Sequence, residues 1–428
     1  MSIKSNWCRC TSCHPGYGWK DNSFDFSSEE KVDCLVCHDT TGTYKKFPTD
    51  CGQPVYEDKK FGSKLFKAVD LSHVARRVGL PDRENCGTCH FYGGGGDGVK
   101  HGDLDSSLFR PSKSVDVHMA EEGLNFECTR CHSTSKHKIS GRRYTEAAPG
   151  KPELALPKDD GNRLKCESCH STRPHSKTTK LNDHTDKVAC QTCHIPAFAR
   201  EHSTKMRWDW SRAGQFKEDG SYLVKKDEAG NLIYHSKKGK MEWEKNVIPE
   251  YSWYNGKMAY IRTGEKIDPG HTVPLNRPLG SPDDNASRIF PFKIHLGKQP
   301  YDPVNRTIII PKVFGPEGSG AYWKDFDWQE SAAAGMAATG LDFSGEVDFA
   351  RTATYWPINH MIPPAEKALE CRDCHKRNGR LAGLNSFYMP GRDSSAQLDR
   401  LGWLAVASAL VLVFLHGFLR ILTRKKKR

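Results

Sequence analysis

Apolar residues are spread unevenly along the chain, and the longest apolar run lies near its C-terminus. Residues 401–419 read LGWLAVASALVLVFLHGFL and contain no Asp, Glu, Lys or Arg. A helix of this length spans about 28 Å, close to the thickness of one bilayer core. Basic residues follow it, including the run RKKKR at the end of the chain, and the positive-inside rule places them in the cytoplasm. The pattern predicts a transmembrane anchor over 401–422, with the preceding residues on the extracytoplasmic or periplasmic side and 423–428 as a cytoplasmic tail.

The remainder of the chain is polar and only weakly periodic. The pattern predicts a short helix around residues 65–77, a strand at 307–313 and a small-residue helix near 331–341. Only 37% of the 428 residues are hydrophobic, which is a thin core for a chain of this length. Another source of apolar bulk is therefore expected, and the cysteines indicate what it is.

Seven C-x-x-C-H motifs use fourteen of the sixteen cysteines. In this motif two thioether bonds hold a c-type haem, and the histidine becomes the proximal ligand of the iron. A single copy would also fit a zinc knuckle or a disulfide hairpin, but seven copies that all end in His favour haem. The sequence predicts seven covalent haem c groups as the interior. The motif residues are Cys10, Cys13 and His14; Cys34, Cys37 and His38; Cys86, Cys89 and His90; Cys128, Cys131 and His132; Cys166, Cys169 and His170; Cys190, Cys193 and His194; Cys371, Cys374 and His375.

The formal net charge of +12 does not indicate a nucleic-acid partner. Each haem brings two propionates, so seven haems contribute about −14 and cancel the excess. No basic helix with interleaved aromatic residues is present, and nucleic acid is excluded as a partner.

A glycine-rich loop follows the third motif directly, with the sequence GGGGDGVKH from Gly93 to His101. Glycines allow backbone to approach a large flat ligand closely, and we expect this loop to build a reaction site over a neighbouring haem. Lys100 could bind iron if desolvation beside a cation lowers its pKa, or it could be an ordinary solvated lysine. The loop also matches G-x-G-x-x-G, but no strand precedes it, so a dinucleotide site is rejected.

Electron-transfer haems usually take a second axial ligand, and twelve histidines lie outside the motifs. If six haems are bis-histidine, the preferred distal ligands lie near the motifs, and His101 and His184 are further candidates. The preferred ligands are His73, His118, His137, His175, His202 and His360.

The predicted fold class is mainly α with much irregular chain, in which covalent haems form the core, plus one C-terminal transmembrane helix. Four segments precede the tail. They are a six-haem region with the glycine loop at 1–203, a cysteine-poor wrapping segment with the seventh haem at 204–390, a linker at 391–400 and the anchor at 401–422. No apolar export segment follows Met1, so the chain is expected to be truncated at its N-terminus.

Several long runs resemble the octahaem tetrathionate reductase family of multihaem c-type cytochromes. They are CGTCHFYGGGGDGVKHGDLDSS, CTSCHPGYGWKD, VDCLVCHDTTGTYKK, CQTCHIPAFAR followed by MRWDWSRAG, and NHMIPPAEKALECRDCH. The resemblance implies Lys100 as the distal ligand of one haem and Asp97 as an acid in the pocket beside it. It also implies that the haem at Cys10, Cys13 and His14 is catalytic, and that tetrathionate, nitrite or hydroxylamine is reduced.

The chain departs from that family at its N-terminal end. The family has an eighth motif upstream, whereas this chain has seven motifs and no room before Cys8. The family's pocket cysteine also lies upstream of the catalytic motif, so Cys8 is the candidate for a catalytic cysteine. Cys51 is expected to be an inert or distant thiol.

Two functions from different classes remain open. The first is a membrane-anchored reductase that receives electrons from a quinol-oxidising or cytochrome b subunit and reduces a small anionic substrate. The second is a non-catalytic carrier that links a quinol-oxidising membrane partner to periplasmic acceptors. His416 within the apolar run is either an interfacial histidine or a contact with the membrane partner.

Overall fold

The computed structural model describes residues 2–132, 134–135, 137–139, 145–146 and 165–424. The chain forms two compact units, Met1–Ala368 and Leu369–Arg428. The first unit contains six of the seven motifs and most of the cysteine-poor segment, and the second contains the seventh motif and the apolar helix. The six-motif region and the segment after it thus share one compact unit.

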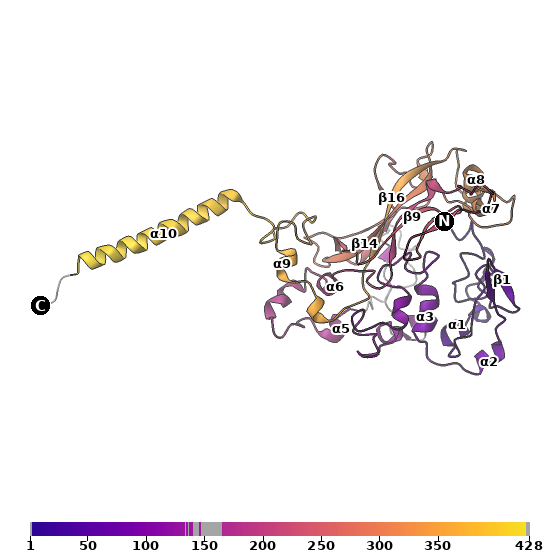
Figure 1. The fold of residues 1–428 in the computed structure, drawn as a ribbon, viewed down its shortest axis with the longest axis horizontal. Helices are drawn as coiled ribbons and strands as arrows, with labels where there is room; N and C mark the ends of the chain where they lie inside the picture. Colours follow the sequence, from indigo (N-terminus) through magenta and orange to yellow (C-terminus); the bar gives the residue numbers. More distant parts are fainter. Residues whose placement is uncertain (1, 133, 136, 140–144, 147–164, 425–428) are drawn as a thin grey trace. The chain divides into compact units, whose positions relative to one another are not determined.

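A nine-stranded mixed sheet is the largest element of the first unit (Figure 1). Its order is β12-β16-β14-β6-β9-β8-β7, and β10 and β15 also pair with β14. The central strand β14 is antiparallel to β16 and parallel to β6. The strands are β6 (Thr204–Asp209), β7 (Val224–Lys226), β8 (Leu232–His235), β9 (Gly239–Glu244), β10 (Glu250–Tyr254), β12 (Val273–Pro274), β14 (Arg288–Asp302), β15 (Thr307–Ile308) and β16 (Asp348–Pro357).

Three smaller sheets complete the described strands. The first joins β1 and β2, the second joins β3 and β4, and the third has the order β13-β11-β5. Their strands are β1 (Lys59–Phe61), β2 (Lys64–Phe66), β3 (Thr134–Ser135), β4 (Lys138–Ile139), β5 (Thr145–Glu146), β11 (Lys257–Tyr260) and β13 (Asn276–Pro278).

Six of the described helices carry C-x-x-C-H motifs, and all of these except the eight-residue α3 are about one turn long. One helical turn brings residues three and four apart onto the same face, so both thiols and the imidazole of a motif can address one haem. These motif helices are α1 (Leu35–His38), α3 (Arg83–His90), α4 (Cys128–Cys131), α5 (Glu167–His170), α6 (Cys190–His194) and α9 (Cys371–Cys374). The other helices are α2 (Leu71–Ala75), α7 (Tyr322–Asp325), α8 (Trp328–Thr339), α10 (Ala396–Leu422) and the 3-10 turns η1 (Glu29–Lys31), η2 (Ser106–Phe109), η4 (Thr179–His184), η5 (Trp210–Arg212) and η6 (Ala365–Lys367).

The prediction of a mainly α fold is wrong, because the large sheet occupies much of the cysteine-poor segment. Strand β14 buries Ile289 and Phe292 but also Lys293, so its sequence lacks a clean alternation of apolar and polar residues. Its long partner β16 lies far along the chain. Strand pairing of this kind depends on tertiary neighbours more than on local propensity, which is why the sequence pattern did not indicate it.

The predicted small-residue helix is confirmed as α8. An added Cβ on its Gly335 would collide with the carbonyl oxygen of Ile310, so only glycine allows this close approach. The helix ends at Gly340, whose φ of +70° is the left-handed conformation typical of a helix C-terminus.

The other two predicted elements are only partly present. Within 307–313 only Thr307–Ile308 is a strand, because the residues after it leave the sheet and pack against α8. Within 65–77 the chain first forms the end of β2, and the helix begins only at Leu71, where the side chain of Asp70 caps it by accepting from the backbone N–H of His73.

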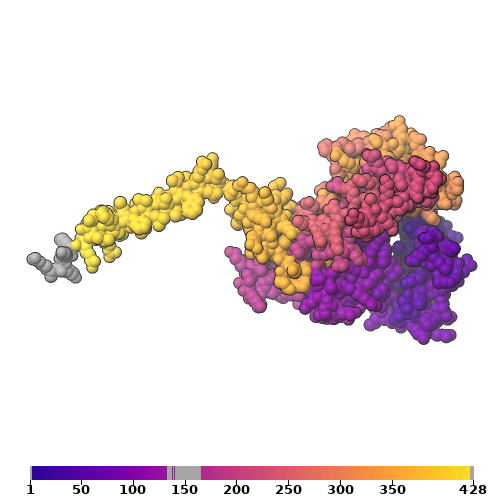
Figure 2. All heavy atoms as spheres, viewed as in Figure 1, coloured from indigo at the N-terminus to yellow at the C-terminus, as the bar shows by residue number. Residues whose placement is uncertain are grey.

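The motif helices and the sheet form two layers of the first unit. Figure 1 shows α1, α3, α5 and α6 on one side of the strands, and Figure 2 shows the same two layers in contact. The backbone N–H of Ala189 before α6 donates to the carbonyl of Ile289 in β14, at 3.0 Å. Among the described residues, buried apolar side chains form four separate clusters of four residues each, rather than one large core. This fits the expectation of a thin side-chain core.

The second unit contains the predicted membrane helix. Helix α10 begins five residues before the predicted start of the anchor at 401 and therefore includes half of the predicted linker. Its 27 residues are long enough to cross a bilayer, and its most apolar stretch of 18 residues has a mean hydropathy of 2.1 and no buried part. Of the predicted tail, residues 425–428 lie outside the described residues.

Cys8 and Cys51 form a disulfide bond. The prediction that Cys51 is an inert or distant thiol is therefore wrong, and Cys8 is not a free thiol in this structure. Both residues have a left-handed backbone, with φ of 64° and 53°. The bond ties the segment before the first motif to the loop after the second motif.

Replacing both Cys8 and Cys51 with serine is expected to lower the free energy of unfolding by about 4 kcal/mol, because the bond closes a loop with a sequence separation of 43. Denaturant unfolding of the haem-loaded protein, followed by circular dichroism, measures this change. The wild-type protein treated with a reductant should lose the same amount, and an unchanged midpoint in both samples would contradict the prediction.

Candidate functional site

The fourteen motif cysteines are all free of disulfide bonds and therefore available for thioether attachment. The thiols of neighbouring motifs also lie close together. Cys89 of the third motif donates to the carbonyl of Cys13 in the first, at 3.9 Å. Cys86 of the third motif is hydrogen-bonded to Cys128 of the fourth. The third attachment site therefore adjoins the first and the fourth.

The same kind of contact extends the row of attachment sites. Cys166 of the fifth motif is hydrogen-bonded to Cys190 of the sixth, and Cys131 of the fourth lies within electrostatic range of Cys169. The second motif is near the third, because Cys37 contributes to the raised pKa of Cys86. Haems attached at six motifs of the first unit would thus be near neighbours.

Four motif histidines face a second histidine from a distant part of the chain. An iron–imidazole nitrogen bond is about 2 Å long, so two imidazoles on opposite sides of one iron have ring centroids about 6 Å apart. The observed centroid distances are 6.3 Å for His38 and His137, 6.1 Å for His170 and His118, 6.3 Å for His132 and His360, and 6.1 Å for His194 and His175. These pairs fit a haem iron between each two rings.

Acceptors on the outer nitrogens orient several of these rings. His360 Nδ1 lies 3.1 Å from the buried carboxylate of Asp103, and His118 Nδ1 lies 3.7 Å from Asp116. His38 Nδ1 lies 2.7 Å from the carbonyl of Gly79. With Nδ1 engaged in this way, Nε2 is left to face the iron, as is usual for histidines that bind metals. The residues present therefore fit covalently attached haem.

The first motif has different surroundings. The ring of His14 is T-shaped to Trp19, with centroids 4.8 Å apart, and it also contacts Phe24 and Phe26. Its carbonyl accepts from Lys46 Nζ at 2.7 Å, and Lys46 forms an ion pair with the buried Asp33. Burial and the charge of Lys46 lower the pKa of His14.

Two predicted distal histidines lie in other surroundings. His73 is exposed on α2, and its Nδ1 accepts from the guanidinium of Arg77 at 2.7 Å. His202 Nδ1 lies 3.5 Å from Asp97 and 3.6 Å from Asp105. Neither ring has the opposed-ring geometry that the four histidine pairs share, so iron ligation by these two residues stays a prediction.

The glycine loop is fixed to the sheet through its backbone. Gly98 accepts at its carbonyl from the hydroxyl of Thr204 at 2.6 Å, and Val99 accepts from the buried amine of Lys293 at 3.1 Å. Gly98 has a φ of +61°, and a Cβ there would lie 2.9 Å from the carbonyl oxygen of Ser203. Glycine is therefore required for the loop to reach β6.

Lys100 extends from this fixed loop towards an aromatic side chain. Its Nζ lies 4.6 Å from the centroid of the Trp356 ring, and His101 stacks edge-on against the same ring at 5.2 Å. The charge of Lys100 contributes to the lowered pKa of His90, after burial and the nearby His132 and His360. Lys100 thus lies near the third motif, which adjoins the first, and its assignment to the haem of His14 stays a prediction.

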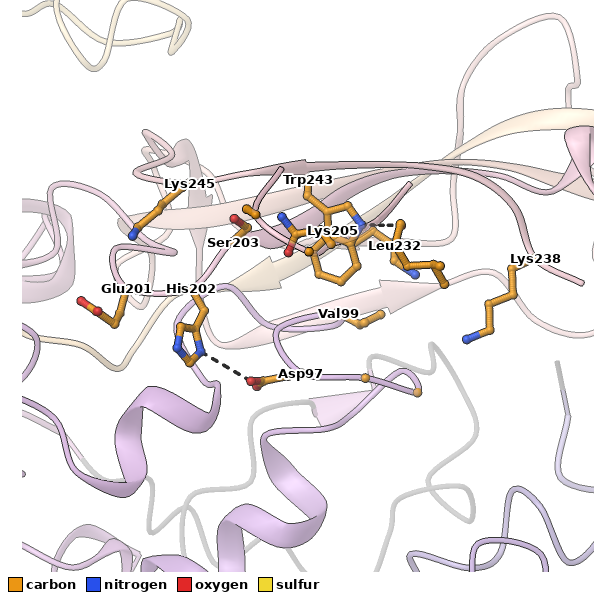
Figure 3. A pocket seen from close by; sticks show the side chains of 15 residues that line it. Asp97, Val99, Glu201, His202, Ser203, Lys205, Leu232, Lys238, Trp243 and Lys245 are labelled. Carbon is orange, nitrogen blue, oxygen red and sulfur yellow. Dashed lines mark hydrogen bonds and ion pairs between the residues drawn. The ribbon is translucent and has the colours of Figure 1, made fainter. Parts of the chain in front are cut away.

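Asp97 lies on the wall of a cavity. It accepts from the backbone N–H of Ser106 at 2.9 Å and from the hydroxyl of Ser106. The cavity has a volume of about 470 Å³ and is walled by the glycine loop, by the turn before β6 and by the β7–β9 region (Figure 3). An acidic side chain from the loop after the third motif therefore faces a space large enough for a small molecule.

Several residues at this site were not singled out from the sequence. Asp103 and Asp105 lie in the quoted run GDLDSS, and their position close to the third motif was the available signal. Lys205, Lys293 and Trp356 belong to strands that the sequence pattern did not indicate, so nothing local connected them with the glycine loop.

Residues 205–378 match a family model described as bacterial cytochrome c. An uncharacterized protein of Archaeoglobus fulgidus is 30% identical over 139 residues, which are 30% of this chain and 46% of that relative, so the chain spans about half its length. The crystal structure of an octahaem cytochrome c from Shewanella oneidensis has a TM-score of 0.77 and 46% sequence identity, over 89% of this chain and 80% of that chain.

Proposed function

The chain belongs to the multihaem c-type cytochrome family that includes octahaem cytochrome c, and from this premise we propose that it is a membrane-anchored reductase. The predicted multihaem cytochrome c fold and covalent haem c attachment are confirmed at this level. We further propose that the protein carries seven haems, one of which is catalytic and has Lys100 as its distal ligand. The proposed substrate is tetrathionate, with nitrite or hydroxylamine as further substrates.

The observation that carries this proposal is that Asp97, in the loop directly after the third motif, lies on the wall of a cavity of about 470 Å³. Four motif histidines already face a second imidazole, which suits electron transfer because six-coordinate iron reorganises little. A pure carrier does not need a cavity with an acid on its wall. Paired histidines that suit electron transfer, together with one cavity that has an acid on its wall, support reduction of a small molecule.

Bound haems would supply electrons singly to the reacting substrate. Reduction of tetrathionate takes two electrons, breaks the central S–S bond and yields two thiosulfate ions without proton uptake. Lys100 would bind iron as a neutral amine. If it is displaced and protonated, its ammonium would stabilise the thiolate charge that develops on the leaving sulfur. Asp97 would deliver protons to nitrogen substrates, whose N–O bonds break only with proton uptake.

The electron donor is proposed to lie in or at the membrane. Helix α10 is long and apolar enough to act as an anchor, and it would hold the haem units on the extracytoplasmic side. A quinol-oxidising or cytochrome b subunit is the proposed partner. His416 lies within α10, where it could contact such a partner or sit at the interface.

The test is a count of haem ligation types on the purified holoprotein, combined with turnover assays. Electron paramagnetic resonance is expected to show several bis-imidazole haems and one haem with an amine ligand. Turnover with a reduced viologen is expected on tetrathionate and on nitrite. Seven equivalent bis-histidine haems without turnover would instead support the alternative of a non-catalytic electron carrier.

A further inference from the structure

The cavity beside Asp97 is lined by side chains of both charges. Asp97, Glu201 and His202 line it together with three lysines that we call the basic wall: Lys205, Lys238 and Lys245. In Figure 3, Lys205 lies between the acidic group and Lys238. Lys205 comes from β6, Lys238 from the turn between β8 and β9, and Lys245 follows β9.

Lys205 is the central residue of the basic wall. Its residue surface is only 3% exposed, although lysines are rarely buried unless paired. Its amine lies 3.6 Å from the ring centroid of Trp208 and 5.3 Å from that of Trp243. Aromatic faces attract an ammonium, but they do not neutralise its charge.

The aromatic rings around Lys205 are held in place. The indole N–H of Trp208 donates to the carbonyl of Lys238 at 2.6 Å, and that of Trp243 donates to the carbonyl of Leu232 at 2.8 Å. The register of β6 against β9 shifts between Lys205 and Arg207. Irregularities of this kind change the direction of nearby side chains, and Lys205 lies directly at this one.

Further positive groups surround the basic wall. Burial and the charge of Lys238 lower the pKa of Lys205 to about 7. The pKa of Lys238 is lowered mainly by burial and also by the charge of Arg9. Lys293, which is fully buried, donates to Thr204 next to Lys205. Asp103 provides a counter-charge for Lys293. Buried cations are costly without a counter-charge, and an anion in the cavity would supply one for Lys205 and Lys238.

We propose that the basic wall is a binding site for small oxyanions, in which Lys205 and Lys238 hold the substrate beside Asp97. This inference rests on the proposed reductase function and names the substrate class of that site as anions of sulfur or nitrogen oxides. The cavity volume of about 470 Å³ is within the range of small-molecule sites. Asp97 lines the same cavity and would lie near the bound anion.

A haem propionate could occupy the same place, because it is also an anion. Arg9, whose charge acts on Lys238, directly precedes the first motif, so a haem attached there would lie near the basic wall. The two occupants differ in the effect of removing the lysine charge. If the lysines bind substrate, removing their charge would weaken the affinity for anions alone. If they bind a haem propionate, removing their charge would shift the reduction potential of that haem and affect turnover of every substrate equally.

The experiment uses the haem-loaded Lys205→Gln and Lys238→Gln variants, with Lys226→Gln on the exposed strand β7 as the control. For nitrite, KM is expected to rise about tenfold in each pocket variant with kcat nearly unchanged, as expected for loss of one hydrogen bond to a charged group. KM for hydroxylamine, which is uncharged at neutral pH, should stay constant. Lys205→Arg should restore most of the nitrite affinity.

Calorimetric titration of oxidised holoprotein with nitrite gives a readout that is independent of turnover. Binding that weakens about tenfold in the two pocket variants, but not in Lys226→Gln, supports the site. If the wild type binds nitrite in this way but reduces nothing, the proposed function fails and the anion site stands. An equal KM rise for nitrite and hydroxylamine, a shifted haem potential, or unchanged nitrite binding would each overturn the inference.

Discussion

Replacing Lys100 with alanine is expected to lower reductase turnover at least about 100-fold, the usual loss when one preorganised charge-stabilising group is removed. The backbone before Lys100 is constrained, because the carbonyls of Gly98 and Val99 accept from Thr204 and Lys293. The amine is also held over the ring of Trp356. Loss of this amine should therefore remove one group without moving the loop.

The spectrum of the Lys100→Ala protein distinguishes iron ligation from a structural role. Only one haem should change its ligation state, and the bis-imidazole signals should be preserved. Lys100→His should instead add a low-spin signal and keep turnover low, because a second imidazole binds iron more firmly than an amine. Lys113→Ala, at an exposed lysine further along the same segment, is the matched control and should behave as wild type. Wild-type turnover in Lys100→Ala would rule out the proposed role.

Replacing Asp97 with asparagine is expected to separate the two classes of substrate. Turnover on nitrite and hydroxylamine should fall about 100-fold, because a positioned proton donor typically contributes this much or more. Turnover on tetrathionate should change less than about twofold, since its reduction needs electrons and no proton. Asparagine keeps the acceptor oxygen for the backbone N–H of Ser106, so the loop geometry should be preserved.

Steady-state assays of the Asp97→Asn protein on all three substrates measure this effect. Asp283→Asn, at an exposed carboxylate far along the chain from the glycine loop, is the control. An equal fall on tetrathionate would show that Asp97 positions the site rather than supplying protons. Unchanged turnover on nitrogen substrates would contradict a role as proton donor.

The sequence by itself determined the features whose signals are local. Each C-x-x-C-H motif spans only five residues, so its spacing alone identifies the two thioether positions and the proximal histidine. The apolar run that became α10 and the small residues of α8 are also contiguous, and each predicts its own helix. The position of Asp97 and Lys100 after the third motif was likewise readable from neighbouring residues.

Only the tertiary structure decided the features that join distant segments. The sheet depends on pairing between β14 and β16, and the disulfide joins Cys8 to a loop beyond two motifs. The predicted distal ligands included His118, His137, His175 and His360, but sequence distance did not say which motif each one faces. The basic wall came from strands that meet the glycine loop only in the fold. A contact between distant residues has no local pattern, because it is stabilised by packing that exists only once the chain has folded.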